Sequence, residues 1–156
     1  MNEVTGPIHI LVDADACPVK EEIYKVCFRL DLPVTIVANS YLRVPEHPLV
    51  QRVVVGSGMD AADDYIAGKA NSASVVITAD ILLAERCLKA GASVIAPDGK
   101  TFDHNSIGSA VAMRSVMEEL RAGGDQVGRN APFTKADRSR FLSTMDTVLT
   151  RLMRKN

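Results

Sequence analysis

The sequence predicts an α/β domain built on a mainly parallel, five-stranded sheet. Five short apolar or β-branched runs alternate with segments whose apolar residues repeat at helical spacing. Gly, Pro or Asn stands at the ends of most of these runs, as expected of strands joined by turns. Such an alternation is typical of a three-layer sandwich with helices on both faces of the sheet. A length of 156 residues fits one domain with a substantial core.

The five predicted strands are unbroken runs rich in Val and Ile, which favour extended backbone. They cover residues 8–12, 34–38, 51–55, 75–79 and 93–96. Residues 41–48 contain Pro45 and Pro48, so this segment is expected to be a loop between the second and third strands.

The predicted helices cover about residues 18–30, 59–70, 80–91, 107–120 and 134–154. Thr134 and Asp137 have the spacing of a capping box and are expected to start the last helix. Its predicted inward-facing residues are Phe141, Met145, Val148 and Leu152. The chain therefore divides into a core at about 8–122, a linker at about 123–133 and a basic C-terminal helix.

Composition points to a cytoplasmic protein without a membrane partner. No apolar run approaches the length of a membrane span, and residues 1–7 lack the features of a signal peptide. The three cysteines are widely spaced, which suits a reducing compartment and matches neither a disulfide framework nor a zinc site. Cys17 has no His nearby in the sequence to activate it, so a catalytic thiol is not expected.

The net charge of −1 conceals an asymmetry between the two ends of the chain. Residues 129–156 contain seven Lys or Arg and two Asp or Glu, whereas the remainder is acidic. This distribution suggests a polyanionic partner that is held at one end. With three Tyr, four Phe and no Trp, the composition argues against a dedicated single-strand binder of the stacking type.

Aspartates follow three of the predicted strands. Asp13 and Asp15 follow the first, Asp60 and Asp63 the third, and Asp80 the fourth. The carboxyl ends of parallel strands meet at one edge of a sheet, so these residues are expected to converge there. Their mutual repulsion would call for a cation, and an all-carboxylate set suits Mg²⁺ or Mn²⁺ better than zinc.

All five aspartates are candidate metal ligands, and Asp13, Asp15 and Asp80 are the candidate catalytic residues. Such a site commonly activates water for the hydrolysis of phosphodiesters. Helix capping is the competing explanation for Asp80, and for Asp60 with Asp63. Thr78 either orients a ligand or satisfies backbone groups at the end of its strand.

Other polar residues are candidates for binding a nucleic-acid phosphate. Lys135, Arg138 and Arg140 lie within two turns at the start of the last helix, where free N–H groups also favour phosphate. Asn39 and Ser40 end the second strand and, with Thr78, could line the same edge of the sheet as the aspartates.

Four blocks of the sequence resemble the YaiI/YqxD family of bacterial proteins. They are Val12-Asp-Ala-Asp-Ala-Cys-Pro18, Gly58-Met-Asp-Ala-Ala-Asp-Asp-Tyr-Ile66, Val76-Ile-Thr-Ala-Asp80 and Phe133-Thr-Lys-Ala-Asp-Arg-Ser-Arg-Phe141. The resemblance implies a fold similar to PIN and NYN nuclease domains, whose acidic residues at strand ends bind Mg²⁺ or Mn²⁺ and cleave RNA or structured DNA.

Carried over residue by residue, the resemblance assigns the first-strand acid to Asp13 and a Thr-x-Asp element to Thr78 and Asp80. PIN domains often have another acid two residues further on, where this chain has Leu82. A metal-dependent nuclease acting on RNA is therefore expected. The alternatives are an inactive RNA-binding or interaction module on the same fold, and a phosphatase-type enzyme that performs phosphoryl transfer.

Overall fold

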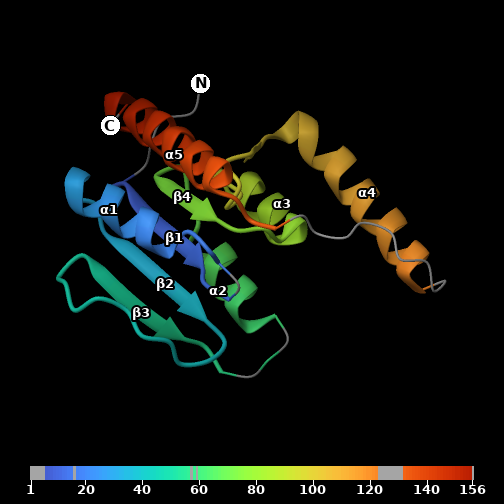
Figure 1. The fold of residues 1–156 in the computed structure, drawn as a ribbon, viewed down its shortest axis with the longest axis horizontal. Coiled ribbons are helices and arrows are strands. Elements are labelled where there is room, and N and C mark those ends of the chain that lie inside the picture. Colours follow the sequence, from blue (N-terminus) through green and yellow to red (C-terminus); the bar gives the residue numbers. More distant parts are fainter. Residues whose placement is uncertain (1–5, 16, 57, 59, 123–131, 156) are drawn as a thin grey trace.

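The strands form one six-stranded sheet with helices packed against it (Figure 1). The computed structural model describes residues 6–15, 17–56, 58, 60–122 and 132–155. The strands are β1 (His9–Asp13), β2 (Val34–Ala38), β3 (Val50–Val54), β4 (Ser74–Ile77), β5 (Ser93–Ile95) and β6 (Thr101–Phe102). Their order across the sheet is β3-β2-β1-β4-β5-β6, and every neighbouring pair is parallel except β5 and β6. The predicted α/β class and mainly parallel sheet are confirmed.

The predicted count of five strands is wrong, because a short sixth strand closes one edge of the sheet. β6 runs antiparallel to β5, with Val94 beside Phe102 and Ile95 beside Thr101. Two residues are too few to show a period in the sequence. The turn between the two strands is tight, since the Ala96 amide donates to the Lys100 carbonyl at 2.8 Å.

Helices pack against both faces of the sheet. They are α1 (Lys20–Leu30), α2 (Ala61–Lys69), α3 (Ile81–Lys89), α4 (His104–Ala122) and α5 (Lys135–Lys155). Side chains of α1 and α5 share one buried cluster with Ile10 and Val12 of β1, whereas α2 and α3 pack with Leu11 on the other side. Figure 1 shows α5 beside α1. It also shows α4, which packs against α3 and points away from the sheet. Within the described residues, no helix is both long and apolar enough to cross a membrane.

The last helix has the predicted cap. The Thr134 amide donates to Asp137 Oδ2 at 2.9 Å, and the Asp137 amide donates to Thr134 Oγ1 at 3.1 Å. Phe141, Met145 and Leu152 are buried as expected, but Leu149 is buried more completely than Val148, which was predicted to face inward. Val148 lies at the margin of the same cluster. The predicted helix start at Met59 and linker residues 123–131 lie outside the described residues.

The order of the strands places a topological switch point beside the end of β1. The chain leaves β1 through α1 on one face, and leaves the adjacent β4 through α3 on the other. Ligands of open parallel sheets bind at such a switch point, beyond the carboxyl ends of the strands. Because Val12 is beside Ile77, the next residues, Asp13 and Thr78, face each other across this point.

Docking of α5 depends on a glycine in the β5–β6 turn. Gly99 has a φ of +92°, and a Cβ at this position would lie 2.7 Å from the Arg140 carbonyl carbon and 2.8 Å from the Phe141 nitrogen. Thr144 Oγ1 also donates to the Gly99 carbonyl at 2.8 Å. The turn and the helix backbone are therefore too close for any side chain between them.

Gly99→Ala should lower the free energy of unfolding by about 3 kcal/mol or more, because backbone strain and displacement of α5 add together. Gly56→Ala is the matched control: its φ is +83°, but nothing lies within 4 Å of the added Cβ. It should cost only about 1 kcal/mol of backbone strain. Urea unfolding measures both variants, and equal losses would contradict a steric role for Gly99.

Candidate functional site

A buried threonine connects the ends of β1 and β4. Thr78 is 1% exposed, and its Oγ1 donates to Asp13 Oδ2 at 2.8 Å. The same oxygen accepts a hydrogen bond from the Asp80 amide at 3.0 Å. Thr78 thus satisfies backbone at the strand end and also fixes the orientation of the Asp13 carboxylate, so both of its predicted roles are compatible with the geometry.

Asp80 caps α3, as its competing explanation proposed. Its Oδ1 accepts hydrogen bonds from the Leu82 amide at 2.9 Å and the Leu83 amide at 3.2 Å. Both bonds use the same oxygen, so Oδ2 has no hydrogen-bond partner among the described residues. Asp80 can therefore cap its helix and still present a carboxylate oxygen to a ligand.

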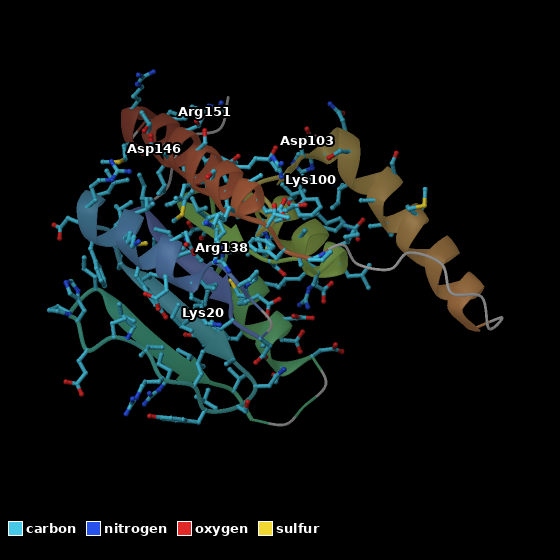
Figure 2. The ribbon with its side chains drawn as sticks, viewed as in Figure 1. Lys20, Lys100, Asp103, Arg138, Asp146 and Arg151 are labelled. Carbon is cyan, nitrogen blue, oxygen red and sulfur yellow. The ribbon has the colours of Figure 1, made fainter. Side chains whose placement is uncertain are left out.

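The loop after β1 is held by contacts on two sides. The Asn39 amide donates to Asp15 Oδ2 at 3.0 Å, which joins the end of β2 to this loop. On the other side, Lys20 Nζ donates to the carbonyls of Ala14 and Cys17, at 3.3 and 3.0 Å (Figure 2). Asp15 is exposed, and so are Asn39 and the adjacent Ser40. These three residues are therefore accessible to a ligand at the sheet edge.

The negative charge of Asp63 is only partly compensated. Asp63 lies half-buried in the first turn of α2, and its carboxylate makes no hydrogen bond with any described residue. Burial, together with the charges of Asp80, Asp13 and Asp60, raises the pKa of Asp63 to about 6. Arg86 opposes this rise only in part, because its guanidinium binds Asp64 at 2.9 Å.

Asp13 experiences the same crowding. Burial raises the pKa of Asp13, and the hydrogen bond from Thr78 opposes that rise. The negative charges of Asp80 and Asp15 raise the pKa further. The charges of Asp13 and Asp80 thus reach Asp63, and those of Asp80 and Asp15 reach Asp13, although the residues follow different strands.

Helix capping does not explain Asp60. This residue occupies the N-cap position of α2, yet its side chain makes no capping hydrogen bond. It is exposed and contributes to the negative potential at Asp63. The capping alternative is therefore correct for Asp80 and wrong for Asp60.

The carboxylates suit a hard divalent cation with a sparse protein shell. Among the described residues, no group of three His, Cys, Asp or Glu side chains is arranged to hold a metal ion. Mg²⁺ usually retains several waters and takes only one or two protein carboxylates, so such a shell requires no closed cage. Asp13 and Asp63 are the two partly buried carboxylates at this edge whose pKa is raised by burial and by neighbouring negative charges.

The predicted phosphate-binding arginines bind groups of the protein itself. Arg138 Nη1 donates to the Pro18 carbonyl at 2.6 Å and to Glu22 Oε1 at 3.2 Å, which joins α5 to the start of α1 (Figure 2). Arg140 Nη1 donates to the Asp98 carbonyl at 3.2 Å and to a carboxylate of its own helix. Lys135 is exposed, and no described residue pairs with it.

Sequence reasoning did not identify Lys20 and Arg86 as neighbours of the site. Lys20 had a local signal, since a cation in the first turn of a helix opposes the helix dipole and usually has a specific partner. Arg86 had none, because Asp64 is 22 residues away on another helix. Cys17 is buried, and burial raises the pKa of its thiol, which disfavours the thiolate that a nucleophile needs.

Asp63 should make the stability of the protein fall as the pH rises. Between about pH 4 and 6 the folded chain holds a proton at Asp63 that the unfolded chain has lost, so folding is penalised above this window. Asp63→Asn should therefore stabilise the protein at pH 7.5 by about 1 kcal/mol after allowance for solvent screening. At pH 4 it should have little effect.

Thermal unfolding in EDTA at both pH values measures this difference. Asp64→Asn is the matched control, because Asp64 is exposed, adjacent in the chain and already paired with Arg86. A gain at pH 7.5 that is equal in the two variants would show that Asp63 is not specifically crowded.

Comparison with known proteins shows similarity along almost the whole chain. A family model described as "Uncharacterized BCR, YaiI/YqxD family" matches residues 11–151. A UPF0178 protein of Sphingopyxis alaskensis is 62% identical over 97% of this chain and 98% of its own length. UPF0178 proteins of Rhodopseudomonas palustris strain HaA2 and of Bradyrhizobium sp. ORS 278 are each 53% identical, over 96% and 99% of this chain and 92% and 94% of their own lengths. No solved structure matches the chain significantly. The chain belongs to the YaiI/YqxD family.

Proposed function

We propose that this protein is a cytoplasmic, divalent-metal-dependent nuclease that hydrolyses phosphodiester bonds, in RNA in preference to DNA, on a PIN-like three-layer sandwich. The observation that carries the proposal is the partly compensated charge of Asp63, which experiences the charges of Asp13 and Asp80 from the switch point of the sheet. Carboxylates that lie near one another without ion-pair partners repel each other, and a bound cation would remove this repulsion.

Each residue then has a distinct role. Asp13 and Asp63 hold Mg²⁺ or Mn²⁺, with Asp80 and the exposed Asp15 and Asp60 contributing through water or charge. A bound ion of this kind would supply a Lewis acid and lower the pKa of a coordinated water. Thr78 positions the Asp13 carboxylate through its 2.8 Å hydrogen bond. The substrate phosphate would be contacted by Asn39 and Ser40, which are exposed at the same edge, and by Lys135.

One observation supports the inactive-module alternative, and another argues against the phosphatase alternative. An inactive RNA-binding or interaction module is favoured by Leu82, which is 42% exposed where PIN domains often have an acid. A phosphatase-type enzyme is disfavoured by the order of its motifs. In that pattern a pair of acids comes after the threonine, whereas in this chain the acid pair Asp63-Asp64 comes before Thr78. The preference for RNA rests on the resemblance to PIN and NYN domains.

Purified protein should cleave labelled single-stranded RNA in Mn²⁺ and not in EDTA. Asp13→Asn should abolish cleavage, and Thr78→Val should lower its rate by about 10- to 100-fold, as expected for a residue that orients a metal ligand. Thr35→Val replaces a threonine within β2 and is the matched control. Cleavage that survives Asp13→Asn would indicate a contaminating nuclease. Hydrolysis of a phosphomonoester in place of RNA would favour the phosphatase alternative.

Metal binding can be measured without any substrate. Mn²⁺ at about 100 times its dissociation constant should stabilise the wild type by about 2.7 kcal/mol. Asp63→Asn should be more stable than the wild type in EDTA, because the substitution removes the repulsion. Mn²⁺ should not stabilise this variant further, because the substitution also removes a metal ligand. Thermal unfolding with and without Mn²⁺ records both effects. Stabilisation by metal without cleavage would favour the inactive module.

A further inference from the structure

Tyr41 is an unusually exposed aromatic residue. It follows the end of β2, in the loop that leads to β3, and is 71% exposed. Leu42 and Val44 of the same loop pack against the core, and these two residues anchor the loop. Exposed aromatic rings on an anchored loop mark binding sites more often than they serve stability.

One face of this ring is covered by a cation. The guanidinium carbon of Arg52 lies 4.4 Å from the centroid of the Tyr41 ring. Arg52 is itself fixed, because its Nη1 donates to the Leu42 carbonyl at 3.3 Å. A guanidinium on one side holds the ring in place, and the high exposure shows that most of the ring remains accessible. The pair is a preformed flat surface.

The charges around this surface suit a polyanion. Arg43 and Arg52 are both exposed, and neither forms an ion pair with a carboxylate in the part of the chain that the structure describes. Glu46 is the one acid within residues 39–54. Free cations beside a flat aromatic ring are the combination with which proteins hold single-stranded nucleic acid.

The chain from the end of β2 connects this surface to the aspartates over a short path. Asp13 is the register partner of Val37 in β2, and Tyr41 is four residues further along the chain. Four extended residues reach at most about 14 Å, and neighbouring strands are about 5 Å apart. Asn39, midway along this path, donates its amide to Asp15. A strand whose phosphate lies at the aspartates could therefore place a base a few nucleotides away on Tyr41.

We propose that Tyr41, supported by Arg52, stacks an unpaired base of single-stranded nucleic acid, and that Arg43 contacts the adjoining phosphate. The proposal rests on the proposed nuclease function and adds the determinant that selects unpaired substrate. The scarcity of aromatic residues argues against an extended series of stacking sites, but stacking one base requires only one ring. In a duplex the bases are stacked on each other, so their faces would not reach Tyr41.

The absence of tryptophan from the sequence allows a site-specific test. Tyr41→Trp introduces a single fluorophore at the platform, and Met113→Trp introduces one on α4, where the native side chain is 61% exposed. Each is titrated in EDTA with short single-stranded oligoadenylate, and total binding is followed by the polarisation of a label on the oligonucleotide. We expect saturable quenching only in Tyr41→Trp, with the midpoint seen by polarisation.

Affinity measurements on variants without an introduced tryptophan complete the test. Tyr41→Ala should weaken single-strand binding by about tenfold, whereas Tyr41→Phe should keep it, because stacking needs the ring and not the hydroxyl. Binding without quenching at position 41, equal quenching by a duplex, or no binding at all would overturn the proposal. So would a Tyr41→Ala variant that loses only thermal stability, since the ring would then merely cover β3.

Separate assays distinguish this proposal from the proposed function. Because binding is measured in EDTA, it does not depend on metal or on cleavage. Cleavage in Mn²⁺ without quenching at position 41 would leave the nuclease in place and remove the platform. Quenching without cleavage would support the platform and the inactive RNA-binding alternative.

Discussion

The site depends on one hydroxyl group that joins two adjacent strand ends. Thr78 donates to Asp13 and accepts from the Asp80 amide, so β1 and β4 end in one hydrogen-bonded unit. A valine of similar shape would leave the carboxylate and the amide without these bonds in a largely buried place, at a cost of about 1–3 kcal/mol each. The unit also fixes the distance between two negative charges. Burial is the largest cause of the raised pKa of Asp13, and the charge of Asp80 adds to it.

Crowding of acids at this edge opposes folding. Burial and neighbouring charges raise the pKa of both Asp13 and Asp63, so each ionised form is less stable in the folded chain than in water. Capping accounts for Asp80, and Asp63 lies in the first turn of α2, where a negative charge is favourable, but the Asp60 side chain caps nothing. Local departures from the rules of stability are expected at functional sites, where a ligand offsets them. This reasoning favours a cation over a purely structural role for the cluster.

The sequence predicted what local patterns and topology determine. Unbroken β-branched runs identified five strands, and the parallel sheet required the aspartates that follow them to meet at one edge. It missed β6, because two residues carry no period, and it placed Val148 where Leu149 is buried. Partners of Lys20, Arg86 and Arg138 were also missed. The contact of Arg138 with Glu22 spans 116 residues, and no local pattern encodes such a distance.

The arginines of α5 already have partners within the protein. The basic tail suggested phosphate contacts, and Nη1 of Arg138 and Nη1 of Arg140 also fasten α5 to the start of α1 and to the β5–β6 turn. Removing them would weaken the fold as well as any ligand contact. Arg43 and Arg52 have no such carboxylate partners among the described residues, and they lie along the chain from Asn39, which contacts the acidic loop. Cations without carboxylate partners are therefore available to a polyanion on the β2–β3 side of the sheet, where Tyr41 lies, as well as at Lys135 at the start of α5.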